Sequence, residues 1–526
     1  MQAYALTIDK IIDHAAKWSS DRETIHAEAG SVVARFGYAE LRERANRLSG
    51  ALTKLGVGPG DRVATLAWNT RHHLELYYGV MGMGCVCHTL NPRLTATQIA
   101  AMINEAGDVV LAASSDLWPL VRRLRDQCPR LKHVIKLENP GDASTDPDEF
   151  EYETLLRELG EAAPWGTFEE NTPAGLCYTS GTTGRPKGVL YTHRSNYLHT
   201  LRALQADAVG LTARDTLLTA VPMFHANGWG LPFAAPAAGA RLVLPGRHLD
   251  GASLLRIMRS EGVTVAAGVQ TVWLGLIDHM DRTGEDLPSL ERVIIGGSSC
   301  PDALIERMET RLGARVQTSW GMTELSPIGT MAPAGEPAQL GGKAGRPLLG
   351  VDLKLTDADG ETLSEQRGVQ GRLMVKGASV VARYFAAEDD AVDAEGFFDT
   401  GDLATIDAEG NLTIRGRAKD LIKSGGEWIN PAEIETIIGA HPSVRHVAVI
   451  ARQDDKWGER PLLVVEREGD GNAATLLGLL HGKVADWWIP DQIADVATMP
   501  LASTGKIDKA RLRANLAEGT LVVEPA

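Results

Sequence analysis

The residues best suited to chemistry form a run rich in glycine and threonine, YTSGTTGRPKG, at positions 178–188. Glycine permits backbone angles that let amide N–H groups converge on phosphate oxygens, and Lys187 adds a mobile positive charge. The neighbouring donors in the run are Thr179, Ser180, Gly181, Thr182, Thr183 and Gly184. Far downstream, a short run, STGK, ends at Lys506. Together the two runs predict a phosphate-binding loop that acts with a distant lysine.

The Walker loop of nucleotide triphosphatases is one alternative for the first run. That loop needs Gly directly before its lysine and Ser or Thr directly after it. Here Pro186 precedes Lys187 and Gly188 follows it, so the Walker pattern is excluded. A surface turn without a ligand is the other alternative, and a run of this length and composition favours a binding loop over such a turn.

Further motifs follow the loop in order along the chain. They are PMFHANGW (222–229), GGSSCP (296–301), SWGMTE (319–324), FFDTGD (397–402), RGRAKDLIKSGGEWIN (415–430) and STGK (503–506). In this order they closely resemble the adenylate-forming superfamily, which includes acyl-CoA synthetases, luciferases and adenylation domains of nonribosomal peptide synthesis. The resemblance covers nearly the whole chain. It implies an enzyme that spends ATP to activate a carboxylic acid.

Two stretches narrow the resemblance further. Residues 62–94 and the GGEWI run at 425–429 are similar to medium- and long-chain fatty acyl-CoA ligases and to the related 3-methylmercaptopropionate-CoA ligases. This subgroup implies a linear carboxylic acid, which attacks the α-phosphorus of ATP to give acyl-AMP and pyrophosphate. The thiol of CoA then displaces AMP. Because a carboxylate is already a nucleophile at neutral pH, the first step needs charge neutralisation more than proton transfer.

The resemblance implies roles for the charged residues. Glu324 and the Thr179 hydroxyl would hold Mg²⁺, which prefers oxygen ligands. Lys506 would be the catalytic lysine, placed between the acyl carboxylate and the α-phosphate. Asp402 would bind both ribose hydroxyls, and Arg417 would add a donor to ribose or phosphate. Taken alone, Glu324 also fits the first turn of a helix, and Lys506 also fits a solvated surface turn.

The adenine is expected beside the SWGMTE motif, with Trp320 stacking on it where most relatives have Tyr. The ATP and AMP contacts implied by the resemblance are Gly297, Ser298, Thr318, Ser319, Trp320, Gly321, Met322, Thr323, Lys423 and Trp428. Thr318 and Ser319 replace the residue pairs that are common in the superfamily. The hydrogen bonds around the base are therefore expected to differ from those of relatives.

The PMFHANGW motif resembles the wall and gate of a fatty-acid tunnel, formed here by His225, Ala226 and Trp229. A packed core indole is the alternative for Trp229. The sequence shows no carboxylate or cysteine partner for His225, so we interpret it as a hydrogen-bonded wall residue and not as a base.

Two half-reactions in one site imply motion. The carboxyl-terminal unit is expected to rotate about a hinge at Lys419, which removes Lys506 after the first half-reaction. The same rotation would bring in a loop that lines the CoA channel, formed by Gly425, Gly426 and Glu427.

Hydrophobic periodicity predicts the elements that position these residues. Residues 38–55 read as a helix that stops at Gly56, residues 62–67 as a strand, and residues 293–295 as a buried strand that ends at Gly296. Residues 138–148 predict a surface loop. Beyond Arg417, a helix at 431–438 and strands at 447–450 and 462–465 predict a separate compact unit. We therefore expect an α/β fold with an AMP- and acyl-binding domain at 1–418 and a mobile α+β domain at 419–526.

Composition agrees with this interpretation. The chain has 526 residues, of which 44% are apolar and 23% charged, as in soluble globular proteins. A formal net charge of −15 disfavours nucleic acid and anionic membranes as partners. There is no leader-like amino terminus and no apolar run approaching the ~18 residues of a membrane span, so a cytoplasmic protein without integral membrane contact is expected. Five scattered cysteines, Cys85, Cys87, Cys128, Cys177 and Cys300, predict free thiols.

The resemblance implies ATP, Mg²⁺ and CoA as cofactor and co-substrates, and a homodimer. Other members of the superfamily remain alternatives: an acyl-AMP synthetase that delivers to a carrier protein, a luciferase-like oxygenase, or a nucleotide-binding relative without catalysis. An amino-acid adenylation module is disfavoured because residues 222–229 contain no acidic residue for a substrate ammonium group. A requirement for CoA separates a ligase from these alternatives.

Overall fold

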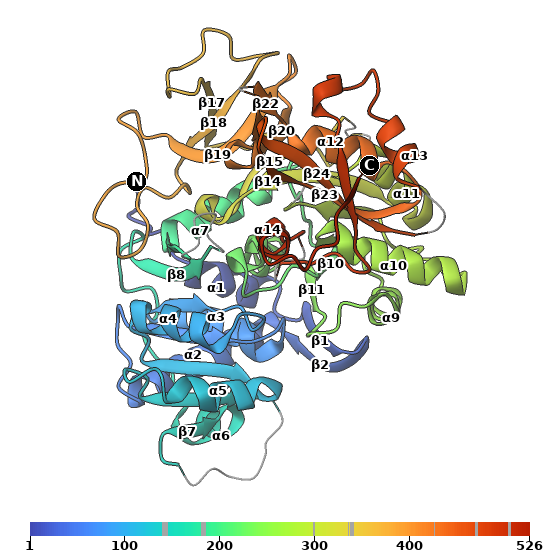
Figure 1. Ribbon diagram of the computed structural model, residues 1–526. Helices are drawn as coiled ribbons and strands as arrows, with labels where there is room; N and C mark the ends of the chain where they lie inside the picture. The colour runs from blue at the N-terminus through green and yellow to red at the C-terminus, as the bar shows by residue number, and fades with distance from the viewer. Residues whose placement is uncertain are drawn as a thin grey trace.

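The computed structural model describes residues 1–138, 146–179, 186–297, 300–334, 336, 341–425, 427–468, 472–502 and 506–525. The fold is α/β, as predicted, with a large amino-terminal body and a small carboxyl-terminal unit (Figure 1). Among these residues, no helix combines the length and apolar character that crossing a bilayer requires. All five cysteines are buried and unpaired, as the sequence predicts.

The first large sheet has nine strands and mostly parallel pairing. Its order is β16 (Arg346–Pro347), β15 (Ile328–Met331), β14 (Arg315–Gly321), β13 (Arg292–Ile295), β12 (Val265–Gly268), β10 (Thr216–Thr219), β11 (Arg241–Leu244), β1 (Glu23–Glu28) and β2 (Ser31–Gly37). The predicted strand at 293–295 is confirmed as β13. Buried helices α9 (Gly251–Glu261), α10 (Gln270–Thr283) and α11 (Asp302–Leu312) accompany this sheet.

The second large sheet has seven strands. Its order is β7 (Glu149–Glu151), β6 (His133–Leu137), β5 (Val110–Ser114), β3 (Arg62–Leu66), β4 (Val86–Thr89), β8 (Pro173–Tyr178) and β9 (Gly188–Thr192). Its helices are α2 (Tyr38–Lys54), α3 (Arg71–Gly82), α4 (Ala96–Ala106), α5 (Trp118–Arg125) and α6 (Tyr152–Leu159). The predicted helix at 38–55 and strand at 62–67 are confirmed as α2 and β3.

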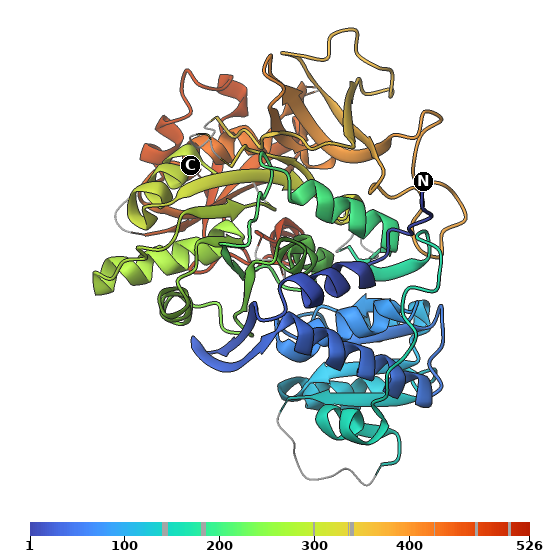
Figure 2. The same cartoon turned by 180° about the vertical axis from the view of Figure 1, so that it is seen from behind.

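Helix α1 (Asp9–Trp18) lies between the two large sheets. It contacts α2 and α3 on one side and α8 (Leu231–Ala238) on the other, as Figure 2 shows from behind. Helix α7 (His193–Ala203) also packs on α8. The side chains of Leu41, Leu48 and Leu52, which carry the periodicity of α2, are fully buried in this core.

Two smaller sheets complete the chain. A four-stranded sheet contains β17 (Val351–Thr356), β18 (Gln370–Gly377), β19 (Phe398–Ile406) and β20 (Leu412–Arg417). A six-stranded sheet contains β21 (Ile422–Ser424), β22 (Glu427–Ile429), β23 (Val444–Asp454), β24 (Gly458–Arg467), β25 (Gln492–Asp495) and β26 (Glu524–Pro525). Its helices are α12 (Pro431–Gly439), α13 (Ala473–Gly478) and α14 (Lys509–Ala517). The helix and strands predicted beyond residue 417 are confirmed as α12, β23 and β24.

A short segment after β3 joins the two large sheets. The Asn69 side chain is 3% exposed and donates to the carbonyl oxygens of Thr219 and Val221 at 3.0 and 2.8 Å. It also accepts from the Met223 N–H at 2.7 Å. The three bonds fix the start of the PMFHANGW segment, which follows β10.

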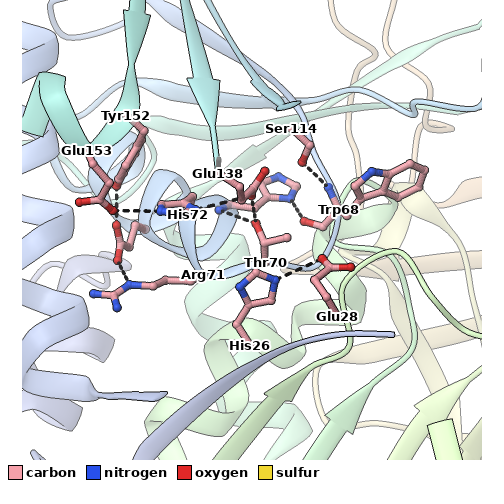
Figure 3. A network of polar contacts seen from close by, with 12 residues as sticks. His26, Glu28, Trp68, Thr70, Arg71, His72, Ser114, Glu138, Tyr152 and Glu153 are labelled. Carbon is pink, nitrogen blue, oxygen red and sulfur yellow. Dashed lines mark hydrogen bonds and ion pairs between the residues drawn. The ribbon is translucent and has the colours of Figure 1, made fainter. Parts of the chain in front are cut away.

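Charged residues hold the same turn from its other side (Figure 3). Thr70 donates to Glu138 at 2.8 Å, and His72 Nε2 lies 3.0 Å from Glu153 Oε1. Burial opposes a charge on His72, but Glu138 and Glu153 outweigh it and raise the pKa of His72 to about 9. The imidazolium therefore bridges two carboxylates at neutral pH. Most of the surface loop predicted at 138–148 lies outside the described residues.

Changing Asn69 to Ala is expected to destabilise the protein by about 3 kcal/mol, because a buried N–H and two buried carbonyls lose their shared partner. Calorimetric unfolding should show a melting temperature several degrees lower. Asn104→Ala is the matched control, since the exposed Asn104 amide makes a single bond to Gln127. Equal melting temperatures for the two variants would contradict this role of Asn69.

Candidate functional site

The predicted site residues gather where parallel strands of the nine-stranded sheet end, the usual position for ligands in such sheets. Gly296 and Gly297 follow β13, residues 319–321 end β14, and residues 222–230 follow β10. The end of β8 lies against this last segment, because Cys177 Sγ accepts a hydrogen bond from the Ala226 N–H at 3.4 Å. The phosphate-loop motif begins directly after β8. The strands thus bring motifs that are distant in sequence to one region of the body.

Asp402 on β19 is buried, and each of its carboxylate oxygens has one partner. Trp320 Nε1 donates to Oδ2 at 3.0 Å, and Arg417 Nε lies 2.9 Å from Oδ1. Burial raises the pKa of Asp402, while Arg417 and the indole N–H oppose this rise. A carboxylate oxygen can accept two hydrogen bonds, so one position remains on each oxygen. This arrangement suits a vicinal pair of hydroxyls such as those of ribose.

Trp320 has a role that the sequence did not indicate. Stacking on a base was predicted from its aromatic ring, and that prediction stays untested. The structure adds the hydrogen bond from the indole N–H to Asp402. A tyrosine at this position has no ring N–H and could donate only from its hydroxyl. The indole packs so closely on Gly329 that a Cβ there would lie 2.6 Å from its Cζ3 atom. Gly329 is therefore required for this placement of the ring.

The hydroxyls next to Trp320 are already engaged. Thr318 donates to the Lys343 carbonyl at 2.8 Å, and Ser319 donates to the Ile295 carbonyl at 3.0 Å. Both are therefore structural donors that tie β14 to its surroundings. Gly321 approaches Pro327 so closely that a Cβ would lie 2.2 Å from its carbonyl oxygen. Met322 donates its N–H to the same oxygen at 3.1 Å. The Thr323 carbonyl accepts from the Tyr191 hydroxyl at 2.9 Å.

Lys506 lies beside Gly297 of the large body, although it precedes α14 of the carboxyl-terminal unit, which is labelled in Figure 1. Gly297 has a φ of +89°, and a Cβ at this position would lie 3.3 Å from Lys506 Cε. The Lys506 side chain is exposed to solvent, yet enough protein atoms lie near its ammonium group to desolvate it in part. Partial desolvation and the Arg417 guanidinium lower the pKa of Lys506, whereas the Asp402 carboxylate opposes this shift. Lys506 therefore interacts electrostatically with both residues of the proposed ribose site.

The PMFHANGW segment ends in an unusual backbone. Residues Ala226–Gly230 form the short helix η2, and all five have positive φ angles between 44° and 70°. Such angles cost about 1–3 kcal/mol for each residue with a side chain, so tertiary contacts must hold the turn. Asn227 donates to Asn196 at 3.3 Å, and a Cβ on Gly230 would lie 2.7 Å from the His199 ring.

This turn aims Trp229 at the strand ends. The indole is 8% exposed, and a Cβ on Gly296 would lie 2.9 Å from its Cη2 atom. Burial, with the charge of Lys506, lowers the pKa of the neighbouring His225 to about 4. At neutral pH the imidazole is uncharged. The segment therefore offers an apolar wall with one neutral polar ring, which is consistent with the interpretation of His225 as a wall residue.

The phosphate loop is described only at its two ends, because residues 180–185, and also Ser298 of the GGSSCP motif, lie outside the described residues. The Thr179 N–H donates to the Lys187 carbonyl at 2.9 Å and closes the base of the loop. Lys187 Nζ lies over the Tyr384 ring, 4.7 Å from its centre. The lysine is thus held by an aromatic face beside the loop.

Glu324, in the short helix η3 (Thr323–Leu325), is 7% exposed. Burial raises the pKa of its carboxyl, and the Tyr384 hydroxyl, which donates to Oε1 at 2.8 Å, opposes this. In the described part of the chain, His, Cys, Asp and Glu form no group of three or more that could hold a metal. Glu324 and Thr179 are the two predicted metal ligands, and both carry hard oxygen donors. This donor set fits Mg²⁺, which keeps water and phosphate oxygens in its coordination shell.

Tyr384 is a site residue that sequence reasoning missed. It lies in the ARYF run between β18 and β19, and its spacing marks no catalytic pattern. A lone tyrosine after a strand usually packs in the core. Only the folded chain places it between Glu324 and Lys187.

Other predicted residues lie apart from this group. Lys423 and Trp428 face each other across the β21–β22 hairpin, with Lys423 Nζ 5.4 Å from the centre of the Trp428 ring. Both side chains are exposed. Gly425 and Glu427 lie on the same hairpin, and Gly426 lies outside the described residues. Where the chain is described, no hydrogen bond or ion pair links this hairpin to Asp402, Trp320 or Arg417. Lys419 lies in the short helix η4 (Ala418–Asp420), between β20 and β21.

Comparison with known proteins adds independent findings. A family model described as AMP-binding enzyme matches residues 12–385, and one described as AMP-binding enzyme C-terminal domain matches residues 433–506. The 3-methylmercaptopropionyl-CoA ligase of Ruegeria lacuscaerulensis is 44% identical over 98% of each chain. The medium-chain-fatty-acid–CoA ligase of Ectopseudomonas oleovorans is 43% identical over 98% of this chain and 96% of its own.

A solved structure in two states is also similar. The ATP-bound structure of MatB from Rhodopseudomonas palustris has a TM-score of 0.85 at 26% identity, covering 97% of this chain and 99% of that one. The apo structure of the same protein has a TM-score of 0.77 at 26% identity, covering 98% and 99%. The described arrangement is thus more similar to the ATP-bound form than to the apo form.

The lowered pKa of His225 predicts a pH-dependent contribution to stability. The unfolded chain binds a proton on this residue near pH 6.5, but the folded chain does so only near pH 4, so native stability falls as pH drops through this window. His225→Gln removes the effect. Calorimetry at pH 7.5 and pH 4.5 should show the variant gaining about 3 kcal/mol relative to the native protein. The exposed His14, changed to Gln, is the control. A constant difference between variant and native protein at both pH values would refute the neutral imidazole.

Proposed function

Because this chain belongs to the family of AMP-binding enzymes, we propose that it is an ATP-dependent, AMP-forming acyl-CoA ligase. Its substrate is a linear carboxylic acid of the medium-chain fatty acid or 3-methylmercaptopropionate type, by similarity to its relatives. The observation that carries the proposal is the position of Lys506. A lysine from the carboxyl-terminal unit reaches Gly297 of the body and interacts electrostatically with the Asp402 carboxylate.

In the first half-reaction the acid's carboxylate oxygen attacks the α-phosphorus of ATP. The new oxygen–phosphorus bond gives acyl-AMP, and the bond to the β-phosphate oxygen breaks to release pyrophosphate. Negative charge builds up around the α-phosphate, and the Lys506 ammonium offsets it. The neutral His225 adds no charge to the acid's side of the cleft. Asp402, set by Trp320 and Arg417, orients the ribose and therefore the α-phosphate.

Glu324 and Thr179 would hold Mg²⁺ delivered with ATP, and the ion would supply charge neutralisation at the phosphates. The chain's own contribution is to present two oxygen ligands beside the phosphate loop. Lys187, at the other end of the same loop, adds its positive charge.

In the second half-reaction the CoA thiol attacks the acyl carbon, loses its proton to water and expels AMP. We propose that the unit at 419–526 rotates on the body at 1–418 about Lys419 between the two steps. Lys506 would leave, and the hairpin with Gly425 to Glu427 would approach the CoA channel. The higher similarity to the ATP-bound than to the apo relative supports assigning the described arrangement to the first half-reaction. A cytoplasmic homodimer is proposed from the superfamily resemblance.

The proposal predicts AMP and pyrophosphate release that depends on both an acid and CoA. A panel of linear acids from propionate and 3-methylmercaptopropionate to palmitate should show one sharp optimum of chain length. Lys506→Ala should lower the rate of adenylation by a factor of about 10²–10³, because it removes the charge that offsets the developing anion. Lys54→Ala, at the exposed end of α2, is the matched control and should retain full activity.

The readouts separate the alternatives. Pyrophosphate release without any CoA requirement would point to an acyl-AMP synthetase that serves a carrier protein. Nucleotide binding with no release of products for any acid would contradict the ligase assignment.

A further inference from the structure

A short segment connects the two parts of the cleft that handle phosphate. Residues 381–385, here named the bridging segment, lie between β18 and β19. At one end the Val381 N–H donates to the Glu324 carbonyl at 2.8 Å, and at the other the Phe385 N–H donates to the Gly188 carbonyl at 2.7 Å. The segment therefore fixes the spacing between the short helix with Glu324 and the strand that leaves the phosphate loop.

The side chain of Tyr384 also connects Glu324 with the phosphate-loop motif, through Lys187. Its hydroxyl donates to Glu324 Oε1 at 2.8 Å, and its ring lies beneath Lys187 Nζ at 4.7 Å. The edge of Phe398 supports the ring, with centroids 6.2 Å apart. Because Glu324 and Lys187 are 137 residues apart in sequence, one residue joins groups that no local element could bring together.

Each contact constrains a different charged group. A hydrogen bond to one carboxylate oxygen fixes the rotation of the carboxyl group and makes Glu324 Oε2 the oxygen with more acceptor capacity for a cation. A ring face attracts an ammonium group but does not neutralise it, so Lys187 stays charged and close to the loop. A phosphate oxygen offers a full negative charge and can draw the lysine away from the ring.

The close packing around Gly188 keeps the bridging segment in place. A Cβ on Gly188 would lie 2.9 Å from Phe385 Cβ, so the strand and the segment approach as closely as backbones allow. The ring of Tyr384 therefore has little freedom to follow Lys187 when the lysine moves.

We propose that Tyr384 is a positioning residue that holds Glu324 and Lys187 in place for magnesium-bound ATP. Its hydroxyl orients the Glu324 carboxylate, which would bind the metal, and its ring holds the Lys187 ammonium group. This inference rests on the proposed function and deepens it. It predicts that the two parts of one side chain can be separated by experiment. Loss of the hydroxyl should weaken only the binding that depends on the metal. Loss of the ring should also weaken binding through the lysine.

The test is calorimetric titration of the full chain with α,β-methylene ATP, which cannot be cleaved at the reacting phosphate. Each protein is titrated in excess Mg²⁺ and again in EDTA. Tyr384→Phe should bind about tenfold more weakly in Mg²⁺ and as well as the native chain in EDTA, because a hydrogen bond to a charged group is lost but the ring remains. Tyr384→Leu should bind more weakly in both buffers. Tyr197→Phe is the control, a half-buried tyrosine on α7 whose hydroxyl has no hydrogen bond among the described residues.

The outcomes are distinguishable. Unchanged affinity of Tyr384→Phe in Mg²⁺, or an equal loss in both buffers, would overturn the inference while native binding upholds the proposed function. Failure of the native chain to bind the analogue in either buffer would overturn the proposed function together with the inference. Thermal unfolding of Tyr384→Phe should remain one cooperative transition well above the titration temperature, which separates positioning from loss of the fold.

Discussion

The contact between Lys506 and the glycine turn after β13 is the constraint on which the site depends. A lysine from the carboxyl-terminal unit lies against Gly297 of the large body, where any side chain would crowd it. Asp402 favours the ammonium form and Arg417 opposes it. The charge of Lys506 is therefore balanced by the two groups that are proposed to bind the nucleotide. In the proposed mechanism, the first half-reaction requires the small unit to be docked in this way.

Contacts within the body hold the segments around Gly297 in place. Asn69 ties the start of the PMFHANGW segment to the end of β3 with three buried hydrogen bonds. The segment then turns through residues with positive φ, which direct the indole of Trp229 at Gly296. Strained backbone of this kind persists only where surrounding contacts determine it. The contacts that stabilise the body therefore also fix the position of Trp229 beside Gly296.

Local patterns in the sequence anticipated the elements, whereas the roles of the site residues stay predictions. The leucine spacing of α2, the short apolar run of β13 and the start of α12 at Pro431 all depend on neighbouring residues, so their predictions were confirmed. The roles of Asn69 and Tyr384 depend on partners far away in the chain, and no local pattern encodes them. The hydrogen bond from Trp320 to Asp402 was missed for the same reason, since it joins two motifs recognised separately. Residues of the phosphate loop at 180–185 remain predictions.

The most direct test of the account is single-turnover kinetics of Lys419→Pro, because proline fixes one backbone angle at the proposed hinge. The account predicts that acyl-AMP forms at the native rate, since the described arrangement is already the one for that step. It also predicts that transfer of the acyl group to CoA becomes many times slower, since the small unit cannot rotate. If both half-reactions kept the native rates, the account of one docked lysine and one rotating unit would be contradicted.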